Sequence, residues 1–139
     1  MLFRSYGNLG SVFTSLGQYG KAKEYLEKAL AVQIEIGDKE GEATSYGNLG
    51  ILFQSLGQYD KAKEYLEKGL DIRKQIGDKE GEAADYGNLA VLHSSVGEFV
   101  AAEDYSQVAL SIAGDIKDLQ KRVRNSLPSC SFEVGPKQG

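Results

Sequence analysis

Three asparagines are the residues of this chain best suited to recognise another molecule. They recur at 40-residue intervals, as Asn8, Asn48 and Asn88. A carboxamide offers both hydrogen-bond donors and an acceptor, which suits the backbone of an extended peptide. Each asparagine follows a glycine (Gly7, Gly47 or Gly87), which adds no bulk and would let a ligand chain come close. The pattern predicts peptide binding. It fits equally well a structural role, in which the asparagines bridge neighbouring helices or hold junction loops.

The sequence offers no comparable set of residues for catalysis or metal binding. The chain has one histidine, His93, and one cysteine, Cys130. A lone histidine without ligands at suitable spacing predicts no metal site, and no nucleophile can be paired with it. His93 replaces an aromatic residue of the pattern, so we expect a packed, hydrogen-bonded side chain. Phosphate-binding glycine motifs are absent from the sequence. We therefore expect a non-enzymatic protein without metal or cofactor.

Charge and hydropathy restrict the kind of partner. The formal net charge is −4, and no basic patch favours nucleic acid or an anionic membrane. No segment reaches the roughly 18 apolar residues that a membrane span needs, and the start of the chain does not resemble a secretory signal. A single cysteine is typical of a reduced, intracellular protein. These features predict a cytoplasmic location and a protein or peptide partner.

The sequence repeats itself with a period of 40 residues. Residues 6–43 recur closely as residues 46–83, and a more divergent copy begins at Tyr86. Such a period is typical of a solenoid, in which each unit covers the apolar face of its neighbour. We predict three units, at residues 1–36, 37–76 and 77–116. The first unit lacks the Gly-Asp-Lys segment that introduces the others, so we expect a longer parent array.

Each unit predicts two antiparallel helices. In the middle unit Asp38 is suited to cap a helix that runs to Leu56, where Gly57 ends it. A second helix then runs from Tyr59 to Ile76. Small residues at matching positions predict a close approach of the two helices: Gly10, Gly50 and Ala90 in the first helix, and Ala22, Ala62 and Ala102 in the second.

The end of the chain departs from the pattern. Asp118 repeats the capping aspartate and is followed by apolar Leu119 and Val123. We predict that residues 117–126 form a degenerate first helix that caps the last unit. Pro128 ends that helix, and residues 127–139, which include Cys130, are predicted to be a disordered tail.

These residues resemble the tetratricopeptide repeat. Tyr46-x2-Leu49-Gly50-x2-Phe53, followed by Ala62-x3-Leu66, is similar to the motif of that family. The period of 40 instead of 34 and the missing proline resemble a subgroup with longer helices, which includes LGN/Pins-type G-protein-signalling modulators, kinesin light chains and large invertebrate arrays. The resemblance implies an all-α, right-handed α-solenoid whose first helices line a concave groove.

The predicted groove residues lie on the face of the first helix opposite the apolar residues that we expect to be buried. On the middle unit this face is small, neutral and polar. The predicted ligand contacts are Asn8, Asn48, Asn88, Thr44, Ile51, Ser55 and Arg73. Arg73 is the charged residue among the apolar residues on one side of the second helix. There it either meets an acidic ligand at the groove edge or extends to water.

The function predicted is a non-catalytic scaffold that binds a peptide or a partner helix in the concave groove. One alternative is a regulatory fragment of a larger signalling protein with an attached effector domain. Another is a self-associating structural unit, because the open end of a solenoid can stack on another copy.

Overall fold

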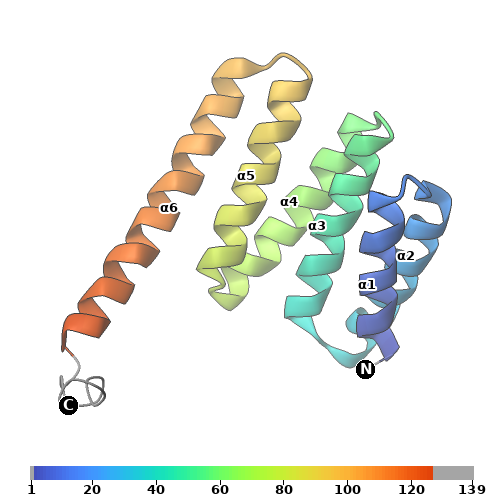
Figure 1. The fold of residues 1–139 in the computed structure, drawn as a ribbon, viewed down its shortest axis with the longest axis horizontal. Helices are drawn as coiled ribbons and strands as arrows, with labels where there is room; N and C mark the ends of the chain where they lie inside the picture. Colours follow the sequence, from blue (N-terminus) through green and yellow to red (C-terminus); the bar gives the residue numbers. More distant parts are fainter. Residues whose placement is uncertain (1, 127–139) are drawn as a thin grey trace, which may run out of the picture.

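Six helices form the whole of the described fold. The computed structural model describes residues 2–126, and side chains for residues 9–125. The helices pack in sequential antiparallel pairs, as predicted (Figure 1). Their bounds are α1 Leu2–Ser15, α2 Tyr19–Ile36, α3 Lys39–Ser55, α4 Tyr59–Ile76, α5 Lys79–Ser95 and α6 Phe99–Ser126. None of these helices is long and apolar enough to cross a membrane.

The helix ends form as the sequence indicates. The Asp38 carboxylate accepts a hydrogen bond from the backbone N–H of Gly41 at 3.0 Å, and Asp78 repeats this cap with Gly81. Glycines in the left-handed region follow the first five helices, among them Gly57 with φ of 77°. Only glycine adopts this backbone without strain, so these residues reverse the chain sharply.

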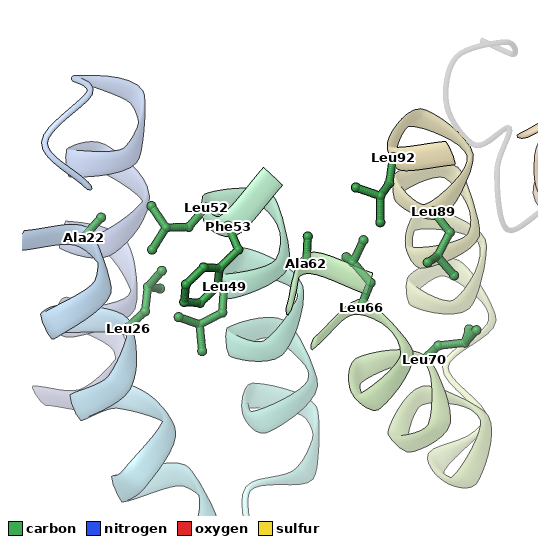
Figure 2. Packing of buried hydrophobic residues seen from close by; sticks show 10 residues of the cluster. All are labelled: Ala22, Leu26, Leu49, Leu52, Phe53, Ala62, Leu66, Leu70, Leu89 and Leu92. Carbon is green, nitrogen blue, oxygen red and sulfur yellow. The ribbon is translucent and has the colours of Figure 1, made fainter. Parts of the chain in front are cut away.

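The core lies between successive helix pairs. Leucines of one pair point at those of the next, with Leu26 of α2 facing Leu49 and Leu52 of α3 (Figure 2). The same arrangement recurs where α4 meets Leu89 and Leu92 of α5. Helices α3 and α5 are therefore buried both by their own partners and by the preceding second helices. This double contact is what gives the repeats a continuous core.

The predicted close approach within each pair is confirmed. A Cβ added to Gly50 would lie 2.7 Å from Cγ of Leu66, and the same contact joins Gly10 to Leu26. In the third pair Ala90 takes the glycine position and Ser106 the leucine position. Where the first helix has the larger Ala90 in place of glycine, the second helix has the smaller Ser106 in place of leucine.

The prediction of a separate capping helix at residues 117–126 is wrong. Helix α6 continues without a break from Phe99 to Ser126 and contacts only α5 among the described helices. Lys117 stands where Gly37 and Gly77 end the earlier second helices. Without a glycine that adopts positive φ, the helix does not turn back. Leu119 is 56% exposed, so this segment does not cover the last unit (Figure 1). The predicted tail, with Cys130, lies outside the described residues.

The first helices lie on the inner side of the array. Helix α1 contacts α3 and α3 contacts α5, whereas within residues 2–126 no contact joins α2 to α4 or α4 to α6. Elements at the inner radius of an arc are closer together than those at the outer radius. The concave surface therefore belongs to α1, α3 and α5, as the resemblance implied.

Candidate interaction surface

Two matching rows of side chains line the inner helices. On α3 the row follows the helical period of i, i+4, i+7 and i+11. It comprises Thr44, Asn48, Ile51 and Ser55, and its counterpart on α5 comprises Ala84, Asn88, Val91 and Ser95. All are exposed except the two asparagines, which are half-buried. The surface is neutral, with one apolar residue between polar ones in each helix.

Hydrogen bonding separates the asparagines from their neighbours. Three hydroxyls of the rows donate to the carbonyl oxygen four residues earlier in their own helix, at 3.0 to 3.2 Å: Thr44, Ser55 and Ser95. Within the described part of the chain, the amides of Asn48 and Asn88 form no hydrogen bond. They are therefore the N–H donors of the two rows that remain available to a ligand. The side chain of Asn8 is outside the described residues.

Gly47, beside Asn48, does not serve a ligand as the sequence suggested. Gly47 is buried, and a Cβ placed there would lie 3.6 Å from Oδ1 of Asp85 on α5. The space that Gly47 leaves is thus used by α5, the first helix of the following unit. The expectation failed because the direction of residue 47 depends on where α5 packs, which one helix alone does not specify.

Arg73 joins three helices at the edge of the inner surface. From α4 its Nε donates to Oδ2 of Asp85 at 3.2 Å, and its Nη2 donates to the hydroxyl of Thr44 at 3.2 Å. Its Nη1 pairs with Asp78, the cap of α5. The side chain is 13% exposed. Its head therefore does not extend to water, and it holds a residue of the predicted groove in place.

The two aspartates around Arg73 differ in electrostatics. Burial raises the pKa of Asp85 to about 6, and the Arg73 guanidinium opposes only part of this shift. At Asp78 the Gly81 backbone N–H and the Arg73 guanidinium lower the pKa of the carboxyl. Asp85 is the group that depends on the arginine most, because it is 4% exposed and has no backbone donor among its contacts.

A neutral pair occupies the same place one repeat earlier. Gln33 and Ser45 correspond to Arg73 and Asp85, and their side chains meet at 2.6 Å. With the amide oriented to satisfy its surroundings, the Gln33 nitrogen donates to the Ser45 hydroxyl and to the carbonyl oxygens of Gly41 and Ala29. Sequence reasoning missed this junction. The sequence did contain a signal of it. From one unit to the next, two residues 12 positions apart change together, from Gln33 and Ser45 to Arg73 and Asp85.

His93 is packed and hydrogen-bonded, as expected. Its ring stacks on Tyr105 with centroids 5.1 Å apart, as Phe53 stacks on Tyr65. Nδ1 lies 2.6 Å from a carboxylate oxygen of Glu98, while the buried Nε2 has no partner. Among the residues that the structure describes, no group of three or more His, Cys, Asp or Glu residues is arranged to hold a metal ion.

We expect His93→Phe to stabilise the chain by about 1 kcal/mol. The substitution removes a buried nitrogen without a partner and restores the ring present at Phe13 and Phe53. The lost bond to Glu98 matters little, because that carboxylate is 60% exposed. Urea unfolding measures the change, with Glu98→Gln as a control that should be nearly neutral. A loss of stability in His93→Phe would show that the histidine is required.

Comparison with known proteins decides the family. A family model described as "Tetratricopeptide repeat" matches residues 1–75, more than half of the chain. The chain belongs to the tetratricopeptide repeat family. Domains of this family generally bind proteins and are typically non-catalytic. A search of curated protein sequences finds no match.

Solved tetratricopeptide-like structures share the fold. BtubC (BKLC) from P. vanneervenii is similar with a TM-score of 0.74 and 28% identity, over 82% of this chain and 46% of BtubC. The chain thus spans less than half the length of BtubC. The TPR domain of Arabidopsis FLU gives a TM-score of 0.75 and 22% identity, over 81% of this chain and 95% of that domain. The second likeness concerns the fold alone.

Proposed function

We propose that this tetratricopeptide domain is a non-catalytic interaction module that binds a segment of a partner protein along α3 and α5. The observation that supports the proposal is the pair of rows on α3 and α5, in which the half-buried amides of Asn48 and Asn88 have no hydrogen-bond partner among the residues that the structure describes. An amide that is half-buried and unpaired is a suitable donor and acceptor for a peptide backbone.

The neighbouring residues indicate what the segment is like. Ile51 and Val91 provide apolar contacts, and the hydroxyls of Thr44 and Ser55 offer acceptor lone pairs. Arg73 is committed to Asp78, Asp85 and Thr44. We therefore propose a segment with polar backbone contacts and small apolar side chains, and assign Arg73 a positioning role through Thr44. Asn8 is proposed to extend the same surface onto α1.

We further propose that the chain belongs to the subgroup of tetratricopeptide proteins with a 40-residue period. Its support is the length of the paired helices, 17 residues in α3 and 18 in α4. The similarity to BtubC (BKLC) is in keeping with this assignment.

Selection from a phage-displayed library of random peptides tests the binding proposal. Peptides selected on the unmodified chain should bind Asn48→Ala/Asn88→Ala at least about tenfold more weakly, which corresponds to about 1.4 kcal/mol. The melting temperature should stay unchanged, because neither amide has a hydrogen-bond partner within the described part of the chain. Calorimetric titration gives both Kd values.

Lys63→Ala is the matched control on the outer surface. Lys63 is an exposed residue of α4, away from the two rows. Peptides that bind this variant normally and the double asparagine variant weakly support the proposal. Peptides that bind all three proteins equally well would place recognition elsewhere.

A further inference from the structure

The two rows that line the inner surface begin with a carboxylate. Glu40 precedes Thr44 by one helical turn on α3, and Glu80 precedes Ala84 in the same way on α5. Both glutamates are exposed. Helices α3 and α5 run in the same direction, so the two side chains lie at the same edge of the array (Figure 1). Each row thus has an acidic end, whereas the serine at its other end is neutral.

The lysines beside these glutamates already have partners. Lys39 pairs with Glu42 at 3.4 Å, and Lys79 pairs with Glu82 at 3.3 Å. Within the described part of the chain, the two carboxylates that begin the rows have no hydrogen bond and no ion pair. They are therefore the acidic groups of α3 and α5 that remain available to a cation of another molecule.

Arg73 does not reverse the charge at this edge. Its guanidinium pairs with two carboxylates, those of Asp78 and Asp85. The three side chains together are therefore acidic when both carboxyls are ionised. The remaining residues of the rows are uncharged. The inner surface along α3 and α5 thus carries negative charge at one edge and no charge along the rest of its length.

We propose that the segment bound along α3 and α5 is basic at one end, so that a lysine or arginine of the partner lies against Glu40 and Glu80. Its uncharged part then covers the asparagines and the apolar residues of the rows. This inference rests on the proposed function and adds the charge and the placement of the ligand. Complementary charge steers association and disfavours wrong partners. An acidic segment fits less well, because Lys39, Lys79 and Arg73 are already paired.

The length of the row predicts the spacing within the ligand. Glu40 and Ile51 are 11 positions apart on α3, which corresponds to about 16 Å along the helix. An extended chain covers that length in about five residues. We therefore expect a lysine or arginine about five positions from an aliphatic side chain in a segment that lies along the row.

Peptides selected on the unmodified chain from a phage-displayed random library test the inference. They should be enriched in lysine or arginine at that spacing from an aliphatic residue. Glu40→Gln/Glu80→Gln should bind them at least about threefold more weakly at low salt, as expected for two exposed ion pairs. The difference should shrink at about 0.5 M salt, because salt screens exposed charges. Calorimetric titration measures Kd under both conditions.

Glu35→Gln/Glu67→Gln is the matched control. It removes the same charge from exposed positions of the outer helices α2 and α4, and it should bind the peptides as the unmodified chain does. An exchange of charge gives the sharper result. Glu40→Lys/Glu80→Lys should lose the basic peptides and bind those in which glutamate replaces the lysine or arginine.

The exchange also separates binding from folding. Both glutamates lie in the first turn of their helices, where a carboxylate stabilises the helix dipole. The melting temperature of the variants should therefore fall slightly, and the titrations are done well below it. A gain of binding to the acidic peptides is a result that partial unfolding cannot produce.

The outcomes distinguish this inference from the proposed function. Peptides weakened by Asn48→Ala/Asn88→Ala, but not by loss of the two glutamates, overturn the basic ligand and leave the proposed function intact. Peptides weakened only by loss of the glutamates support the basic ligand and overturn the role of the asparagines. Peptides that bind every variant equally well overturn both.

Discussion

Arg73→Gln is expected to destabilise the chain by about 3 kcal/mol, at the lower end of the range for breaking a buried ion pair. The substitution leaves the carboxylate of Asp85 buried without a cation. A glutamine amide can still donate a hydrogen bond to it, but cannot neutralise its charge. Asp85→Ser should cost less, about 1–2 kcal/mol, because Arg73 keeps its contacts with Asp78 and Thr44.

The double variant Arg73→Gln/Asp85→Ser should recover to within about 1 kcal/mol of the unmodified chain. It recreates at the second junction the pair that Gln33 and Ser45 form at the first. Urea unfolding of all four proteins gives the coupling free energy between the two sites. Additive effects of the two substitutions would mean that the guanidinium and the carboxylate do not stabilise each other.

The pH dependence of the free energy of unfolding tests whether the buried carboxyl of Asp85 causes these changes in stability. Burial raises the pKa of Asp85 to about 6, above the ordinary value of 3.8, so the folded chain binds a proton more tightly than the unfolded chain does. The contribution of this group to stability is therefore largest at low pH and is lost as pH rises through about 6. In Arg73→Gln the loss should extend to higher pH, because the guanidinium no longer opposes the shift. Asp85→Ser removes the loss altogether.

Gly50→Ala is expected to destabilise the chain by about 1–2 kcal/mol, although alanine is the better helix former. The added Cβ would lie 2.7 Å from Cγ of Leu66 and 3.2 Å from the carbonyl oxygen of Ala62. Overpacking of this kind costs about 1–3 kcal/mol, and it outweighs the gain in helix propensity of about 1 kcal/mol. Chemical unfolding at equilibrium measures the net change.

Gly114→Ala is the control for that substitution. Gly114 is also inside a helix, but an added Cβ there has no atom within 4 Å. The propensity gain should then stand alone and stabilise the chain by about 0.5–1 kcal/mol. Opposite signs for the two variants would separate packing from propensity. A stabilised Gly50→Ala would show that Leu66 moves aside at little cost.

Local sequence features predicted most of the helices correctly. The caps at Asp38 and Asp78 and the left-handed Gly57 depend on residues within one or two turns, and the structure places them as expected. The same local logic, applied to residues 117–126, gave too much weight to Asp118. Whether α6 stops is decided by the residue before it, where Lys117 replaces a glycine.

The interaction surface was predictable only in part. The helical period is enough to place Thr44, Asn48, Ile51 and Ser55 in one row of α3. Period alone does not say which neighbour lies beside that row. For this reason Gly47 was expected on the ligand face and is instead buried against α5, and the contacts of Arg73 were not foreseen.

The sequence by itself determined the repeat, the helix pairs and the family, because each depends on short-range patterns that recur along the chain. Only the tertiary structure decided what Arg73 binds, which side chain fills the space beside Gly47, and which of the equivalent apolar positions are buried. These properties depend on the packing of one repeat against the next. The same position, such as Leu52 and its equivalent Val12, is buried or exposed according to whether a preceding helix pair covers it.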